Sequence, residues 1–236
     1  VPPPPPPPAT NLVVNSGFEN GNGKDGWTCG SYVYATTAQH QGSSGDTSLW
    51  HRPKPAITTS AYQRIDVVGL AFETPFFDAR KARAAARAIR LPLVVMDITQ
   101  EHLSMLRAPR YGYGRNMNPC LDCHALMLRI AGGKMDALGA AFLATGEVLG
   151  QRPMSQNKQS LYVVAKHSGY LPRVLRPLSA RLLPETEPER CGLVDRARLL
   201  DIEGRSRKRQ MDLAVHYGIT RYSAPAGGCL LTDPMF

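Results

Sequence analysis

The stretch Ile65-Asp66-Val67-Val68-Gly69-Leu70-Ala71-Phe72 is an almost uninterrupted run of apolar and β-branched residues. Strands that are buried on both faces of a parallel sheet have this composition, whereas the strands of half-exposed antiparallel sheets alternate apolar and polar residues. We therefore predict a buried parallel strand at this point of the chain.

Helical and strand patterns alternate after this stretch. Residues 79–89 are rich in Ala and Arg and contain neither Gly nor Pro, which predicts a helix. Residues 91–98 predict a second buried strand with its proline near the start, where strands tolerate it. A further helix is expected over residues 125–138 and a third strand over residues 140–145. This alternation predicts an α/β domain with a parallel sheet and helices on both of its faces.

Polar residues follow each predicted strand. They are found in Glu73-Thr74-Pro75, in Asp97-Ile98-Thr99 and in the loop that starts at Gly146-Glu147. Ligands bind parallel sheets beyond the carboxyl ends of the strands. The glycines and polar side chains of residues 146–156 are suited to a loop that approaches a nucleotide or a phosphate.

Two cysteines stand three positions apart in Asn116-Met117-Asn118-Pro119-Cys120-Leu121-Asp122-Cys123-His124, and a third lies in Pro225-Ala226-Gly227-Gly228-Cys229. Five cysteines in a chain of 236 residues do not indicate a disulfide framework. A C-x-x-C pair is more typical of metal or redox chemistry in a reducing compartment.

Four interpretations of the C-x-x-C pair are open. The two thiols could be buried at the start of a helix. A structural zinc needs four ligands, so His124 would have to join Cys120, Cys123 and Cys229, and adjacent Cys123 and His124 rarely reach one ion. Cys-x-x-Cys-His also matches c-type haem attachment, which the surrounding α/β pattern argues against. A [4Fe–4S] cluster on Cys120, Cys123 and Cys229 would leave one iron free to bind sulfide.

The positive charge of the chain is concentrated in its larger part. Residues 64–236 hold 25 basic and 16 acidic side chains, a net charge of +9, whereas residues 1–63 hold three of each. Such asymmetry suggests a polyanionic partner. The stretch Gly204-Arg205-Ser206-Arg207-Lys208-Arg209-Gln210 opens a predicted helix, and its cations suit either a solvated face or phosphate contacts. No run of 18 apolar residues occurs, so no membrane span is expected.

Residues 1–63 have a different composition. Residues 1–10 contain a run of prolines, which predicts an extended polyproline II linker. Residues 11–63 predict short strands and turns. They resemble the start of a jelly-roll carbohydrate-binding module through Asn11-Leu12-Val13-Val14-Asn15-Ser16-Gly17-Phe18-Glu19, Gly26-Trp27, His40-Gln41-Gly42-Ser43 and Ala61-Tyr62-Gln63. A complete jelly roll has about eight strands, so this segment is expected to be partial, with Trp27 and Trp50 either stacking on sugars or packing in a core.

Several segments of residues 65–236 together carry a second resemblance. They are, in order, Phe72-Glu73-Thr74-Pro75-Phe76-Phe77, Asn118-Pro119-Cys120-Leu121-Asp122-Cys123-His124, residues 146–156, Arg176-Pro177-Leu178-Ser179, residues 204–210 and residues 225–229. In this order they resemble the PP-loop ATPase family of tRNA thiolation enzymes, of the thiouridine-synthase or 2-thiouridylase type. The resemblance implies a HUP-type α/β fold in residues 64–236. It also implies a transferase that activates a tRNA uridine with ATP as an adenylate and then delivers sulfur.

The same resemblance implies roles for individual residues. The sulfur would come from a donor protein or from sulfide, and the partner would be tRNA. The implied cluster ligands or sulfur carriers are Cys120, Cys123 and Cys229; the residues bordering ATP and Mg²⁺ are Gly146, Glu147, Gln151 and Arg152; and those approaching tRNA phosphates are Arg205, Arg207, Lys208 and Arg209.

One part of the family pattern is missing. The Ser-Gly-Gly-x-Asp-Ser loop, whose amides cradle the ATP pyrophosphate at a helix start, does not occur in the sequence. Residues 11–63 stand where its strand and loop should be. We therefore expect an N-terminally truncated PP-loop domain in a chimeric chain, with thiolation impaired, and whether the chain is an enzyme stays open.

Two alternatives to thiolation follow from the same features. One is an extracellular protein that binds polysaccharide through Trp27 and Trp50. The other is a non-catalytic iron–sulfur module that binds RNA. A cytoplasmic location is expected for residues 64–236, whereas residues 11–63 are of a type that is usually secreted.

Overall fold

The computed structural model describes residues 11–14, 66–114, 116–220, 222, 229–233 and 235. At its centre is a five-stranded sheet in the order β3-β2-β1-β4-β5, in which all paired neighbours are parallel. The predicted parallel α/β architecture is confirmed. The strands are β1 (Asn11–Val14), β2 (Val67–Glu73), β3 (Leu93–Asp97), β4 (Leu143–Ala144) and β5 (Val174–Leu175).

The central strand of the sheet comes from an unexpected part of the chain. β1 pairs with β2 from Asn11↔Val67 to Val14↔Leu70, and on its other side with β4. The sequence assigned Asn11–Val14 to the partial jelly-roll segment, and the structure instead places them in the α/β sheet. A short apolar run suits a buried parallel strand as well as a strand of a β-sandwich. The other residues of that segment lie outside the described part of the chain, as does the polyproline run.

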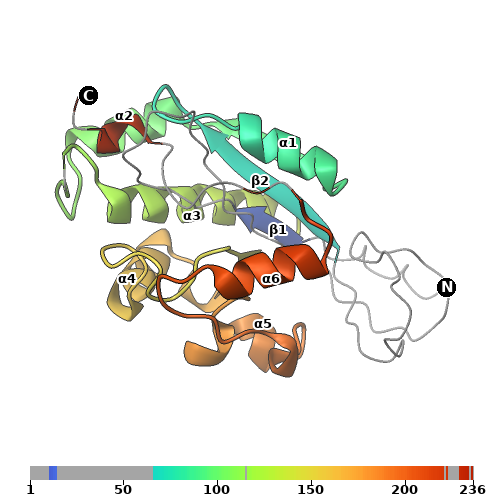
Figure 1. Ribbon diagram of the computed structural model, residues 1–236. Helices are drawn as coiled ribbons and strands as arrows, with labels where there is room; N and C mark the ends of the chain where they lie inside the picture. Colours follow the sequence, from blue (N-terminus) through green and yellow to red (C-terminus); the bar gives the residue numbers. More distant parts are fainter. Residues whose placement is uncertain are drawn as a thin grey trace, which may run out of the picture.

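Both faces of β2 are covered by helices, which explains its continuous apolar sequence. On one face, Ala71 packs with Ala79 and Ala82, at the start of helix α1 (Arg80–Ala88). On the other face, Leu70 and Phe72 belong to the large core that contains α3. Figure 1 shows α1 and α3 on opposite sides of the sheet.

Five further α-helices are present in the described residues. They are α2 (Thr99–Arg107), α3 (Cys120–Ala137), α4 (Lys158–Ser168), α5 (Glu187–Arg190) and α6 (Lys208–His216). Two of them, α3 and α6, overlap helices predicted from the sequence, whereas α2, α4 and α5 were not predicted. The helix expected at residue 125 begins five residues earlier, directly after Pro119, so both cysteines of the C-x-x-C pair lie in its first turns.

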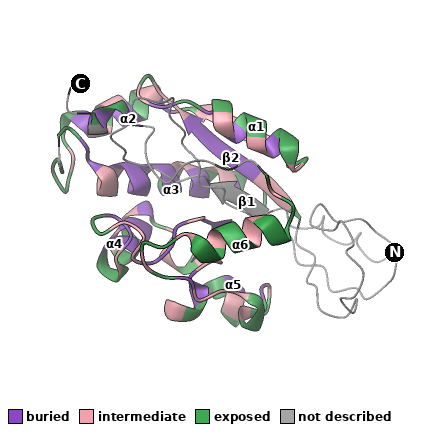
Figure 2. Cartoon of the chain, viewed as in Figure 1, coloured by how far each residue is buried: buried purple, intermediate pink, exposed green. Residues whose placement is uncertain are grey.

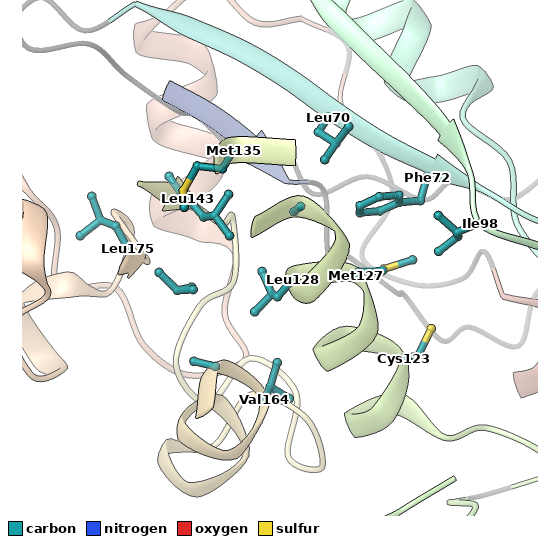
Figure 3. Packing of buried hydrophobic residues seen from close by; sticks show 14 of the residues in the cluster. Leu70, Phe72, Ile98, Cys123, Met127, Leu128, Met135, Leu143, Val164 and Leu175 are labelled. Atoms are coloured by element: carbon teal, nitrogen blue, oxygen red, sulfur yellow. The ribbon is translucent and has the colours of Figure 1, made fainter. Parts of the chain in front are cut away.

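Helix α3 is the centre of the hydrophobic core. Leu128, Ala131 and Met135 are completely buried along it. In Figure 3, Met127 lies on the side of Phe72 and Ile98, and Leu128 lies on the side of Val164 on α4. The ring of Tyr170 also packs directly against α3, at Gly132. A Cβ atom on Gly132 would lie 2.0 Å from Cε2 of the Tyr170 ring, so only glycine fits at this position.

Candidate functional site

Four segments meet beyond the carboxyl ends of the strands. They are the loop after β2, the start of α3, the loop after β4 and the C-terminal segment with the short helix η5 (Leu230–Thr232). The amide of Leu230 donates a hydrogen bond to the carbonyl of Phe76 (3.1 Å), which fixes the C-terminal segment against the loop after β2. Phe77, Cys123 and Cys229 share one buried cluster. This meeting point is where a parallel sheet binds its ligands.

Two of the three predicted thiols interact with each other at this point. Burial raises the pKa of the Cys229 thiol to about 12, and the nearby Cys120 raises it as well. Burial also raises the pKa of the Cys120 thiol, but a hydrogen bond to Oδ1 of Asn118 (2.9 Å) and the charge of Arg152 oppose this effect. Because the thiolate is the reactive form, Cys120 is the better nucleophile of the two.

Cys123 has a different environment. Its side chain is buried next to Met127, within the core that extends from Phe72 and Ile98 to α4 (Figure 3). Among the residues that the structure describes, no three His, Cys, Asp or Glu side chains are grouped so that they could hold a metal ion. The [4Fe–4S] cluster on Cys120, Cys123 and Cys229 therefore stays a prediction.

A buried ionic network lies under the loop that follows β4. The carboxylate of Glu147 is completely buried; it accepts hydrogen bonds from Nε of Arg176 (2.8 Å) and from Oγ1 of Thr145 (3.0 Å), and it contacts Nδ1 of His124 (3.2 Å). Burial by itself would raise the pKa of Glu147, but Arg176 and His124 together lower it to about 2. His124 is on α3 and Arg176 follows β5, so this network connects the cysteine helix to the sheet.

The predicted nucleotide-binding residues divide into two groups. Gly146, Gln151 and Arg152 are partly exposed on the loop, and the charge of Arg152 reaches Cys120. Glu147 is buried with its carboxylate already engaged, so its position in the structure suits support of the loop from inside. Contact of these residues with ATP and Mg²⁺ stays a prediction.

The loop after β4 also contacts the start of the basic segment. The amide of Gly204 donates to the carbonyl of Leu149 (2.8 Å), and Leu149 forms a parallel bridge with Glu203. Gly150 has a φ of 73°, and a Cβ atom there would lie 3.3 Å from the Gly204 nitrogen. The predicted nucleotide loop and the predicted RNA segment are therefore neighbours.

The basic segment itself lies on the surface. Arg205, Lys208 and Arg209 are exposed and Arg207 is partly exposed. Arg209 forms an ion pair with Asp201 (2.6 Å). No residue of α6 is buried, as the green and pink colouring of this helix in Figure 2 shows. Its cations are accessible to a polyanion, and contact with tRNA phosphates stays a prediction.

One buried polar residue near the site was not predicted from the sequence. His102 on α2 is completely buried against the rings of Phe76 and Phe77, and neither of its ring nitrogens has a hydrogen-bond partner among the described residues. Burial lowers its pKa from 6.5 to about 4. The spacing of Ile98, His102 and Leu106, one helical turn apart, is the pattern that could have revealed it.

No family model, curated protein or solved structure matches this chain. No helix in the described part of the chain is long and apolar enough to cross a membrane.

Proposed function

We propose that the α/β domain transfers sulfur to a uridine of tRNA in an ATP-dependent reaction. The observation that carries this proposal is that the C-terminal segment with Cys229 packs beside the loop after β2 and the start of α3, which bears Cys120, beyond the carboxyl ends of a parallel sheet. The charge of Arg152, on the loop after β4, also acts on Cys120. Two thiols and a guanidinium at such a site suit the handling of reduced sulfur beside an anionic substrate.

Within this proposal, the two thiols have different tasks. Cys120 would carry the sulfur as a persulfide, because it is only partly buried and Arg152 favours its thiolate. Cys229 would stay protonated at neutral pH, since its pKa is raised to about 12. It therefore supplies a second, neutral thiol beside the sulfur carrier. The basic segment, with Arg205 and Lys208 exposed, would contact the RNA backbone.

ATP would supply the activation. It converts the uridine oxygen into an adenylate with release of pyrophosphate, and the outer sulfur of the Cys120 persulfide then displaces AMP. The base is at that point joined to Cys120 through a sulfur–sulfur bond. A dithiol reductant cleaves this bond, which releases the thiouridine and the Cys120 thiol and converts the reductant into a disulfide. Because the sequence lacks the Ser-Gly-Gly-x-Asp-Ser loop, we expect weak ATP binding, with a rate that rises with ATP concentration without reaching saturation.

The direct test uses the purified chain, a tRNA transcript, ATP with Mg²⁺, a persulfide donor and a dithiol reductant. Thiouridine is measured by its retardation in a gel that contains an immobilised mercury compound. We expect ATP-dependent product that is lost in Cys120→Ser and kept in Cys191→Ser, because Cys191 is exposed and lies outside the site.

Two results would contradict the proposal. Absence of thiouridine at any ATP concentration would exclude tRNA thiolation by this chain. Equal product from Cys120→Ser would exclude the role of this thiol. Iron analysis after anaerobic reconstitution tests the cluster separately, with Cys120→Ala as the control.

A further inference from the structure

The exposed side of α4 carries an alternating row of cations and an aromatic ring. Lys158, Tyr162 and Lys166 follow one another at four-residue intervals, about 6 Å along the helix axis per step, and all three are exposed. Tyr162 leaves 47% of its surface exposed, and the Lys166 ammonium lies 5.9 Å from its ring centroid. The opposite side of α4, with Leu161 and Val164, is buried.

A loop adjacent to α4 continues this row. Arg110 Nη1 lies 3.3 Å from Nδ1 of His167, and the Tyr111 ring meets the His167 ring edge-on at 5.4 Å. The amides of Arg110 and Tyr111 donate to the two carboxylate oxygens of Asp122 at 3.1 and 2.9 Å. The loop is therefore held, while the Tyr111 ring stays 40% exposed.

We name the side chains of Arg110, Tyr111, Lys158, Tyr162 and Lys166 the tyrosine surface. It lies next to the thiol site, because Asp122, which holds the amide of Tyr111, is in the same helical turn as Cys120.

The sequence segments that carry the tyrosine surface are basic. Residues 108–119 and 150–169 together contain five Arg and Lys residues and neither Asp nor Glu. Among the described residues, Asp122 contacts the loop with an acidic side chain, and its carboxylate accepts hydrogen bonds from two amides. A surface of this kind is complementary to a polyanion. The exposed tyrosines beside the cations make it complementary to a polyanion that also has flat apolar groups.

We propose that the tyrosine surface binds a single-stranded stretch of RNA. Tyr111 and Tyr162 stack on unpaired bases, while Arg110, Lys158 and Lys166 contact phosphates. Single strands bind proteins through this combination of a basic track and aromatic platforms, because duplex bases are already stacked on each other. The choice of RNA rests on the proposed function. The surface is separate from the basic segment at residues 205–209, and it would bring an unpaired base close to Cys120.

The test measures binding of a fluorescein-labelled, uridine-rich RNA oligonucleotide by fluorescence anisotropy, using the full chain at several salt concentrations. We expect Tyr162→Ala and Tyr111→Ala each to weaken binding by about fivefold or more, the loss typical of one stacked base. Tyr162→Phe keeps the ring and should bind within about twofold of the wild type. Lys158→Gln and Lys166→Gln should each make the salt dependence shallower, by about 0.7 in the slope of log K against log salt.

A duplex of the same sequence should bind less tightly than the single strand. If the wild type binds RNA but the tyrosine variants are unchanged, the tyrosine surface is not the binding site, although tRNA thiolation would still stand. In that case neutralising Arg205, Arg207, Lys208 and Arg209 should abolish binding. If the wild type binds neither form of RNA at low salt, this inference and the proposed function both fail. Circular dichroism of each variant checks that its fold is intact.

Discussion

Replacing His102 with phenylalanine should remove the loss of stability that this residue causes at mildly acidic pH. His102 is completely buried between α2 and the loop after β2, where Phe76 and Phe77 contact its ring. Its neutral form is the one that fits this apolar environment, because a buried charge without a partner is costly. When the pH is low enough to protonate His102 in the unfolded chain but not in the folded chain, the proton stabilises the unfolded state.

The magnitude follows from the pKa, which burial lowers from 6.5 to about 4. Between these values the unfolded chain binds a proton that the folded chain does not, so stability falls as the pH is lowered from 6.5 and levels off below 4. Each pKa unit is worth about 1.4 kcal/mol, and acidification from about pH 7.5 to about pH 4.5 therefore costs about 2.5 kcal/mol at this residue. Phenylalanine does not titrate, so His102→Phe should not show this loss.

The assay is urea unfolding followed by circular dichroism, with the free energy of unfolding determined for both proteins across this pH range. The difference between variant and wild type cancels the titration of all other groups, including Glu147, whose stabilising charge is lost only as the pH falls from 4.5 towards about 2. His216→Phe is the matched control, because it makes the same substitution at a histidine that is exposed on α6. A difference between His102→Phe and the wild type that is constant with pH would refute the reasoning.

Three further changes have expected outcomes. Gly132→Ala should destabilise the chain by about 1–3 kcal/mol, because the new methyl group would lie 2.0 Å from the Tyr170 ring. The neighbouring Gly133→Ala should stabilise the chain by about 0.5–1 kcal/mol, because its methyl group would meet no atom within 4 Å. Urea unfolding distinguishes the two signs. Arg176→Met should cost about 3–5 kcal/mol by the same measurement, since it leaves the buried Glu147 carboxylate without its strongest partner, and Arg176→Met combined with Glu147→Leu should recover part of that loss. Alkylation by iodoacetamide at neutral pH, followed by peptide mass spectrometry, should modify exposed Cys191 before Cys120, and Cys229 only after unfolding.

The elements that the sequence predicts well are those specified by local pattern. β2 is an apolar run buried between helices, and α1 is an Ala-rich segment without a breaker, so local pattern determines their type. The apolar run of β3 also forms a strand, but the prediction that it is buried is wrong, because β3 lies at the edge of the sheet and is only partly buried. β1 could not be recognised in this way. Its four residues form a parallel strand through pairing with β2 and β4, which lie more than fifty residues away in the sequence. Nothing within residues 11–14 specifies that pairing.

The site was predictable to a similar extent. The C-x-x-C pair is a local motif. The direction of α3 decides that Cys120 lies near Arg152 and that Cys123 lies in the core, and this direction could not be predicted from the motif. The partners of Glu147 could not be inferred from spacing, because His124 is 23 residues before it and Arg176 is 29 residues after it. Sheet order brings these three residues together, and sheet order is a property of the whole chain.

The sheet order also determines where a nucleotide could be held. From β1 the chain builds outward through β2 and β3, and it then returns to the other side of β1 for β4 and β5. In such sheets ligands bind at the point of reversal, which here lies beyond Val14 of β1 and Ala144 of β4. On the β1 side, the sequence continues with Asn15-Ser16-Gly17-Phe18-Glu19 and not with the Ser-Gly-Gly-x-Asp-Ser loop.

A phosphate group at this point would therefore depend on the β4 side, where Gly146 and Arg152 are partly exposed. Arg152 would then serve two partners, the nucleotide and the Cys120 thiol, whose pKa its charge lowers. Binding of ATP should for this reason decrease the rate at which Cys120 is alkylated, because the phosphates neutralise the charge that favours the thiolate. An alkylation rate that does not change with ATP would place the nucleotide elsewhere, or exclude its binding.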